Sequence, residues 1–413
     1  MKKKILIIGA GIGQYYLAQK IKDRGHYLIT VTLPGNQPVI DIADKVCYHD
    51  VFDKEGVLAI AREEQIDAVI SDQNDTMMPT VACVAEKLGL PGNNVQQVNA
   101  FCNKNVFRDN CDKLGIPVPR HCSMNKVEIP EALKDVPFPW VVKPADSQSS
   151  IGVAKVDNKE EYLTALKIAI ELSKNKSAIV EEFFKGQELV AEGFIYKGKY
   201  YVLGFADRKY FKLNNMFIPS QTIFPSLVPK TILKKIEQYE SKMAEYIKPS
   251  FAIVHSEYLY NPDTNEIRVV ESALRGGGVY ISSHLVPLYS GIDINDTLID
   301  CIVGNDVDME KVMSKRNNKA AGYVCFYLPG GTVCKADGME EARQLDFVKM
   351  MCVNDVKVGM VTPPLTHKGQ RLGPILVTGS DRNDIEQNIK TLQETLQIMV
   401  KGEDGVIRGI NWN

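Results

Sequence analysis

The fold is decided by His255-Ser-Glu-Tyr-Leu-Tyr260 and Arg268-Val-Val-Glu-Ser-Ala-Leu-Arg275-Gly-Gly-Gly278, which are joined through the turn Asn261-Pro-Asp-Thr-Asn265. Both segments favour strands and the connection is short, so they predict a β-hairpin with Glu257 on one strand and Glu271 on the other. Mg²⁺ prefers hard oxygen ligands, usually one or two carboxylates together with nucleotide phosphates. Two acids followed by an arginine and three glycines therefore indicate a magnesium–nucleotide site, although the hairpin alone also fits solvated surface acids.

Composition sets the class of protein. The chain has 413 residues, a net charge of −2, 45% hydrophobic and 24% charged residues, which predicts two to four globular domains. The net charge gives no reason to expect nucleic acid or a membrane surface as a partner. The sequence contains no apolar run of about 18 residues, so no membrane span is expected. Nine scattered cysteines without metal-type spacing favour a reduced, cytoplasmic protein. A homodimer is a fair expectation for a soluble protein of this kind.

Residues 2–99 alternate apolar strands and amphipathic helices, which predicts a βαβ unit with a parallel sheet. Its expected strands and helices are Lys4–Ile8, Gln14–Arg24, Tyr27–Leu33, Val57–Glu64, Ala68–Ser71 and Met78–Leu88.

The rest of the chain predicts a mixture of helices and strands. A strand-rich block is expected from Trp140 to about Gly204, and residues 207–230 are expected to form an aromatic loop, with a β-hairpin as the alternative. The expected helices are Val95–Leu114 (as more than one helix), Thr231–Tyr246, Ile294–Val303 and, within an α+β module that starts at Lys319, Asp384–Val400.

A glycine-rich loop, Gly9-Ala-Gly11-Ile-Gly13-Gln14, follows the first expected strand. A dinucleotide-binding fingerprint needs a third glycine where Gln14 stands and an acid after the second strand. The second strand instead ends in Thr32-Leu-Pro-Gly35, so we interpret the glycines as a tight turn between a strand and a helix. An NAD-dependent dehydrogenase is the less favoured alternative.

Two further segments suit a nucleotide. Trp140-Val-Val-Lys143-Pro144 leads into a small polar loop whose backbone N–H groups can cover phosphates, with Lys143 adding positive charge. About 25 residues after this segment, Ala178-Ile-Val-Glu181-Glu-Phe-Phe184 offers free backbone groups for an adenine ring. Glu188, four residues farther on, can accept hydrogen bonds from both ribose hydroxyls. Taken alone, this segment also fits an edge strand with solvated glutamates.

These motifs occur in the order found in ATP-grasp enzymes: Asn103-Lys104-(x3)-Arg108, the Lys143 strand and loop, Glu181-(x6)-Glu188, and Glu257 with Glu271-(x3)-Arg275. The chain most resembles carboxylate–amine ligases of that superfamily, particularly amino-acid (dipeptide) ligases. It is also similar to D-alanine–D-alanine ligases and to the glycinamide ribonucleotide synthetase group. The resemblance implies an ATP-grasp fold of α/β and α+β type. Its parts would be a Rossmann-like pre-ATP-grasp domain (1–99), a small lid subdomain (100–184), a large subdomain (185–310) and a C-terminal ligase module (311–413).

The resemblance also implies roles for individual residues. ATP with Mg²⁺ or Mn²⁺ would phosphorylate a small carboxylate, and an amine would then attack the acyl phosphate. Arg275 and Lys143 would be catalytic, and Glu257 and Glu271 would hold metal, with Glu271 bridging two ions. The nucleotide would contact Lys104, Lys143, Ser149, Ser150, Gly152, Glu181, the Phe184 backbone and Glu188.

One departure from the family pattern is Ala273, which stands where the family usually has a metal-binding asparagine. Water can take that ligand position. Two alternatives therefore stay open: a ligase for a ribonucleotide- or sugar-linked amine, and a non-catalytic ATP-binding sensor. No general base for the amine stands out, with His255 and His284 as candidates. Arg208 or Lys209 is expected to hold a substrate carboxylate, and Arg371 is a further candidate for binding an anion.

Overall fold

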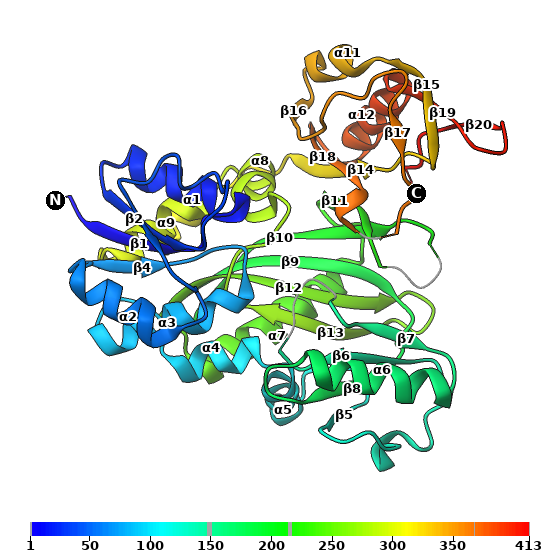
Figure 1. Ribbon diagram of the computed structural model, residues 1–413. Helices are drawn as coiled ribbons and strands as arrows, with labels where there is room; N and C mark the ends of the chain where they lie inside the picture. Colours follow the sequence, from blue (N-terminus) through cyan, green and yellow to red (C-terminus); the bar gives the residue numbers. More distant parts are fainter. Residues whose placement is uncertain (1, 147–150, 214–216, 367, 413) are drawn as a thin grey trace.

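The computed structural model describes residues 2–412 except 147–150, 214–216 and 367. The N-terminal domain has a parallel sheet with strand order β3-β2-β1-β4. It lies beside helix α9 (Ile294–Ile302) in Figure 1. The predicted βαβ pattern is confirmed, and one strand, β3, was not predicted. The elements of this domain are β1 (Lys4–Ile8), α1 (Ile12–Asp23), β2 (Tyr27–Thr32), β3 (Lys45–Tyr48), α2 (Lys54–Glu63), β4 (Ala68–Ile70), η1 (Asp75–Met77) and α3 (Met78–Leu88).

Two short helices lead from this domain into a four-stranded antiparallel sheet with order β5-β8-β6-β7. One helix, α6, packs on this sheet because its Tyr162, Leu166 and Ala169 recur at helical spacing and are buried. The elements are α4 (Val95–Cys102), α5 (Lys104–Leu114), β5 (His121–Met124), η2 (Glu131–Leu133), β6 (Trp140–Pro144), β7 (Ala154–Val156), α6 (Lys159–Leu172) and β8 (Ala178–Glu182).

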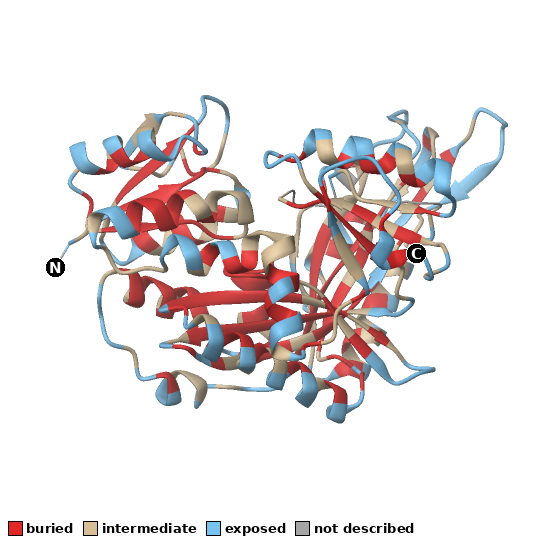
Figure 2. Cartoon of the chain, turned by 90° about the horizontal axis from the view of Figure 1, so that it is seen from below, coloured by how far each residue is buried: buried red, intermediate tan, exposed pale blue. Residues whose placement is uncertain are grey.

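The centre of the molecule is an eight-stranded sheet with order β13-β12-β9-β10-β11-β14-β18-β16. Its long middle strands are buried on both faces, and exposed residues gather on the surrounding helices (Figure 2). The predicted acidic hairpin is confirmed as β12 and β13. In its turn, the Asn261 side chain accepts a hydrogen bond from the backbone N–H of Asp263, a contact that favours the turn conformation. The elements are β9 (Gln187–Tyr196), β10 (Lys199–Tyr210), β11 (Pro219–Phe224), α7 (Lys230–Ile247), β12 (Phe251–Asn261), β13 (Glu266–Ala273), η3 (Ile281–Leu285), α8 (Val286–Ser290) and α9.

The C-terminal part contributes three strands to this central sheet and forms a second small sheet with order β17-β15-β19-β20. The joint between the two parts is the antiparallel pairing of β11 with β14. The elements are α10 (Met309–Met313), β14 (Ala320–Phe326), β15 (Gly331–Asp337), α11 (Met339–Gln344), β16 (Val348–Met351), β17 (Val361–Thr362), η4 (Lys368–Gln370), β18 (Leu372–Gly379), α12 (Arg382–Thr395), β19 (Gln397–Lys401) and β20 (Ile407–Gly409).

Three predicted segments differ from the structure. The block from 140 to 204 contains helix α6 in addition to strands. Much of the segment 207–230 is the β10–β11 hairpin, which was the alternative interpretation, rather than a loop. The last predicted helix ends at Thr395, and Gln397–Lys401 is a strand paired with β15. Across the described residues, the helices are too short or too polar to span a bilayer.

Candidate active site

Glu257 and Glu271 are directly opposite each other on β12 and β13. Facing side chains on antiparallel strands have Cβ atoms about 4.5–5.5 Å apart. The two side chains are 26% and 31% exposed and both line a cavity of about 220 Å³. No group of three or more His, Cys, Asp or Glu side chains placed to hold a metal was found in the described part of the chain. Two adjacent carboxylates still fit Mg²⁺, whose other ligands are commonly phosphate oxygens and water.

Arg208, on β10, lies between Glu257 and the predicted ribose ligand Glu188. Its guanidinium is 2.6 Å from Glu188 and also donates to Glu257, while Tyr210 donates its hydroxyl to Glu188. Burial and the nearby charge of Glu257 raise the pKa of Glu188. Burial also acts to raise the pKa of Glu257, but Arg208 and His255 outweigh it and hold that pKa well below its usual range. We call Glu188, Arg208 and Glu257 the open cluster, because Arg208 and Glu257 line the cavity.

Arg275 comes just after β13 and donates to both carboxylate oxygens of Asp75, at 2.7 and 2.8 Å. Asp75 lines the same cavity, and Asp72 accepts from Gly276 N at 2.7 Å. A Cβ on Gly276 would lie 2.2 Å from Ser282 Oγ, so only glycine allows this approach. Burial raises the pKa of Asp72 to about 6.

Sequence reasoning missed Asp72 and Asp75. Both follow β4 at the carboxyl end of a parallel strand, where ligands of α/β sheets usually bind. That position was the signal that could have found them.

His255 lines the cavity and is held between two acids. Its Nδ1 is hydrogen-bonded to the buried Glu192, and its Nε2 is 3.4 Å from Glu257. Burial acts to lower the pKa of His255, but Glu192 and Glu257 outweigh it and raise that pKa. His284 instead packs against the rings of Tyr16 and Tyr280, and it does not line this cavity.

A second cluster of acid and base lies at the start of the predicted adenine segment. Arg108 and Lys143 bind opposite oxygens of Glu181 at 2.7 and 2.6 Å, and the side chains of Arg108 and Glu181 are each 2% exposed. Burial acts to raise the pKa of Glu181, but the two cations outweigh it and lower that pKa to about 2. We call this the closed cluster, because its carboxylate is fully used by protein groups. Contacts from this segment to adenine would therefore come from its backbone, and Phe184 lies 5.0 Å below the guanidinium of Arg268.

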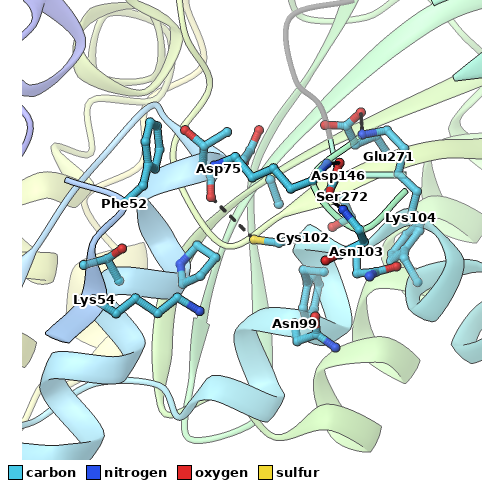
Figure 3. A pocket seen from close by; sticks show the side chains of 18 of the residues that line it. Phe52, Lys54, Asp75, Asn99, Cys102, Asn103, Lys104, Asp146, Glu271 and Ser272 are labelled. Atoms are coloured by element: carbon cyan, nitrogen blue, oxygen red, sulfur yellow. Dashed lines mark hydrogen bonds and ion pairs between the residues drawn. The ribbon is translucent and has the colours of Figure 1, made fainter. Parts of the chain in front are cut away.

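Lys104 begins α5 and lies 3.8 Å from Glu271. Both residues line a second cavity of about 380 Å³, and they point toward one another in Figure 3, across the cavity from Phe52 and Lys54. This cavity shares Asp75 and Glu271 with the first. The structure thus brings Lys104, Glu257, Glu271 and Arg275 to one connected site.

The remaining predicted residues belong to two glycine-containing stretches of the sequence. Ser149 and Ser150 lie outside the described residues. Gly152 has φ +73°, and a Cβ there would lie 2.8 Å from Pro144. In the N-terminal loop, Gln14 accepts from Gly11 N and a Cβ on Gly9 would lie 2.5 Å from Met77 Sδ. Gly9 also has φ +90° between β1 and α1, so the predicted tight turn and this close packing both require glycine there.

One row of cross-strand partners connects the open cluster to the C-terminal strands. Arg208 pairs with Thr222 on β11, and Thr222 pairs with Tyr323 on β14. Tyr323 and Arg371 line the 220 Å³ cavity as well, so the C-terminal part contributes to its wall. Lys209, by contrast, is exposed and does not line this cavity.

Comparison with known proteins agrees with this geometry. Residues 136–283 match the family described as ATP-grasp domain, and residues 324–401 match L-amino acid ligase C-terminal domain 2. Alanine–anticapsin ligase of Bacillus subtilis (strain 168) is 24% identical over 62% of this chain and 58% of its own length. Formate-dependent phosphoribosylglycinamide formyltransferase of Saccharolobus solfataricus is 23% identical over 96% of this chain and 97% of its own.

Among solved structures, the L-amino acid ligase from Bacillus licheniformis superposes with a TM-score of 0.80 at 21% identity, covering 97% of this chain and 99% of that one. This likeness shows the fold. The two matched domains and the named relatives agree with the motif order read from the sequence. Residues 136–283 are thus an ATP-grasp domain and residues 324–401 an L-amino acid ligase C-terminal domain, and the chain is similar to the ATP-grasp carboxylate–amine ligases, enzymes that form C–N bonds.

Proposed function

We propose that this enzyme joins an amino acid, or a similar small carboxylate, to an amine at the expense of ATP. The γ-phosphoryl group of ATP passes to a carboxylate oxygen of the substrate, which gives an acyl phosphate and ADP. The amine nitrogen then forms a bond to the acyl carbon, the carbon–oxygen bond to phosphate breaks, and the amine loses a proton. The observation that carries the proposal is the facing pair Glu257 and Glu271 in a cavity that also holds Arg208 and Arg275.

Phosphoryl transfer depends mainly on positioning and on neutralising charge. Glu257 and Glu271 would hold Mg²⁺, which neutralises phosphate charge when it is bound. Lys104 is next to Glu271 and would contact the nucleotide phosphates. Arg275 is kept in place by its two bonds to Asp75 and would face the transferring phosphoryl group.

The nucleotide would lie between the β5–β8 sheet and the central sheet. Lys143 would interact with both Glu181 and a phosphate. Glu188 would accept a hydrogen bond from a ribose hydroxyl, which would replace the present hydrogen bond from Arg208 or Tyr210. An acyl phosphate reacts with water, so a loop that closes over the site would be useful. The candidate from the sequence is the segment 147–152, of which residues 147–150 lie outside the described part of the chain.

A second candidate is a ligase for an amine carried on a ribonucleotide. The full-length similarity to a phosphoribosylglycinamide formyltransferase favours it. The third hypothesis is an ATP-binding sensor without turnover. Ala273 favours it, because this residue stands where the family usually has a metal-binding asparagine.

The test is ADP and phosphate release from Mg²⁺–ATP against a matrix of amino acids, small amines and glycinamide ribonucleotide. ADP that requires both a carboxylate and an amine, with an amide product detected by mass, is the expected result. AMP with pyrophosphate would exclude the acyl-phosphate mechanism.

The matched variants are Glu271→Gln and, on the same strand, the exposed Glu266→Gln. The first should lower ADP release by at least about a hundredfold, because a ligand of the metal loses its charge. The second should leave it unchanged. A sensor has no ADP release to lose in either variant.

A further inference from the structure

The cations that line the 220 Å³ cavity differ in whether the protein itself supplies their counter-charge. Arg275 is paired with Asp75, Arg208 with Glu188 and Glu257, and His255 with Glu192 and Glu257. Arg371 is the exception, since it forms no ion pair with any described residue. Partial burial of a guanidinium without a neighbouring carboxylate is unfavourable in free energy, and a bound anion would compensate the charge.

Two contacts hold Arg371 in position without using up its donors. Its NH1 donates to Pro219 O at 2.8 Å, and its guanidinium lies 5.9 Å from the centre of the Tyr323 ring. A guanidinium has five N–H donors, and one of them is bonded to a described residue. The others are available for the two oxygens of a carboxylate, the geometry for which arginine is best suited.

The place of Arg371 in the fold indicates which substrate carries the anion. Arg371 directly precedes β18, and its ring partner Tyr323 lies on β14, so both belong to the C-terminal part. The metal-site acids are on β12 and β13, at the other end of the strand order of the central sheet, and these strands lie on the side of the small β5-β8-β6-β7 sheet, the expected lid, in Figure 1. If the nucleotide enters from the lid side, the amine that attacks the acyl phosphate approaches from the side of Arg371.

We infer that Arg371 binds the carboxylate of the amine substrate, so that the amine is itself an amino acid and the C-terminal part selects it by charge. This inference rests on the proposed ligase function and deepens it. A phosphate group on a ribonucleotide-linked amine has related chemistry, and the test separates the two sources.

The first measurement needs no variant. Wild-type kcat/KM is compared for a panel of L-amino acids, the corresponding amino-acid amides and glycinamide ribonucleotide, each as the amine, with the carboxylate substrate saturating. The amide has the same amine and side chain without the negative charge. We expect the free acids to be favoured at least about tenfold over their amides, the size of one charge-assisted interaction. Equal use of acid and amide, or a preference for the ribonucleotide, would overturn the inference.

The second measurement uses Arg371→Gln, Arg371→Lys and, as a matched control in the same module, the surface variant Arg343→Gln. Arg371→Gln should lower kcat/KM for the free acid about tenfold to a hundredfold and change the value for the amide less than about twofold. KM for ATP should not move. Arg371→Lys should restore part of the loss, because it keeps the charge without the planar fork. Equal losses for acid and amide, or a change in KM for the carboxylate substrate instead, would contradict the assignment.

A binding readout separates failure of this inference from failure of the ligase proposal. The melting temperature of the full chain with Mg²⁺–ADP and phosphate is measured with a panel of dipeptides and their C-terminal amides. Wild type should be stabilised more by the free carboxylates, and Arg371→Gln should lose that preference, even if no turnover has been found. No preference in wild type would overturn the role of Arg371.

Discussion

The open and closed clusters both join glutamate to arginine, and they differ in the number of acids per cation and in what surrounds them. In the closed cluster, Arg108 and Lys143 neutralise Glu181 completely, inside the molecule. In the open cluster, Arg208 is shared by two carboxylates at the wall of a cavity, and Glu257 is 26% exposed. The comparison teaches that the number of acids per cation and the access to solvent, rather than the motif alone, decide whether a glutamate can serve a ligand.

The largest expected effect separates the two clusters by activity. Glu257→Gln should lower ADP release about a hundredfold to a thousandfold, because a metal ligand loses its charge at the site of phosphoryl transfer. Its free energy of unfolding should fall by about 1–2 kcal/mol, less than for Glu181→Gln, because Arg208 keeps Glu188 as a partner when Glu257 loses its charge. Steady-state kinetics and urea unfolding check both numbers. An active Glu257→Gln enzyme would remove the distinction between the clusters.

The reverse is expected for the closed cluster. Glu181→Gln should lower the free energy of unfolding by about 3–5 kcal/mol, because the buried charge of Arg108 is left without a carboxylate and Lys143 loses its partner. Urea unfolding measures the loss. Glu171→Gln, on the exposed face of α6, is the control and should cost less than about 0.5 kcal/mol. Equal stability of the two variants would show that Glu181 is not the neutralising group.

The pH dependence of stability sharpens the same point. The pKa of Glu181 is about 2 in the folded chain against its ordinary value of 4.5, a difference of roughly 3 kcal/mol. The folded state therefore gains this stability above pH 4.5 and loses it as the pH falls from about 4.5 toward 2. The stability gap between wild type and Glu181→Gln should be constant from pH 8 to about 5 and narrow below that. A gap that narrows near pH 6, or that keeps its full size at pH 3, would assign the effect to another group.

The smallest expected effect concerns the affinity of the proposed site at Glu257 and Glu271 for Mg²⁺. Ala273→Asn adds an amide oxygen two residues from Glu271 on the same strand, and Ala273 lines the 380 Å³ cavity, where there is room for it. The Mg²⁺ concentration for half-maximal activity should fall about twofold to fivefold, with kcat little changed. Mg²⁺ titration of ADP release, compared with wild type, measures it. A rise in the Mg²⁺ requirement would mean that water serves better at this position.

The parts of the fold that sequence could predict are the local ones. The β12–β13 hairpin could be predicted because its turn residues and its strand-forming residues are contiguous in the sequence. Helix α6 was missed because it lies between strands and its buried face is narrow. The pairing of β11 with β14, about 100 residues apart, has no local signature.

The same holds for the site. Glu257 and Glu271 could be placed because one short turn fixes their register. Arg208 could not be assigned to Glu188 and Glu257, which are 20 and 49 residues away from it. The closed character of Glu181 depends on Arg108, 73 residues earlier. Contacts at such separations are set by tertiary packing, which a single sequence does not display.

The β11–β14 pairing has a consequence for taking the protein apart. A chain ended after α10 would leave β11 as an uncovered edge strand, with its hydrogen-bonding groups in water and the buried Thr222 and Ile223 newly exposed. Such edges recruit strands from other molecules. We therefore expect the ATP-grasp core to aggregate when it is produced without the C-terminal strands. Chimaeras between this enzyme and its relatives should for the same reason keep the core and the C-terminal strands of one parent together.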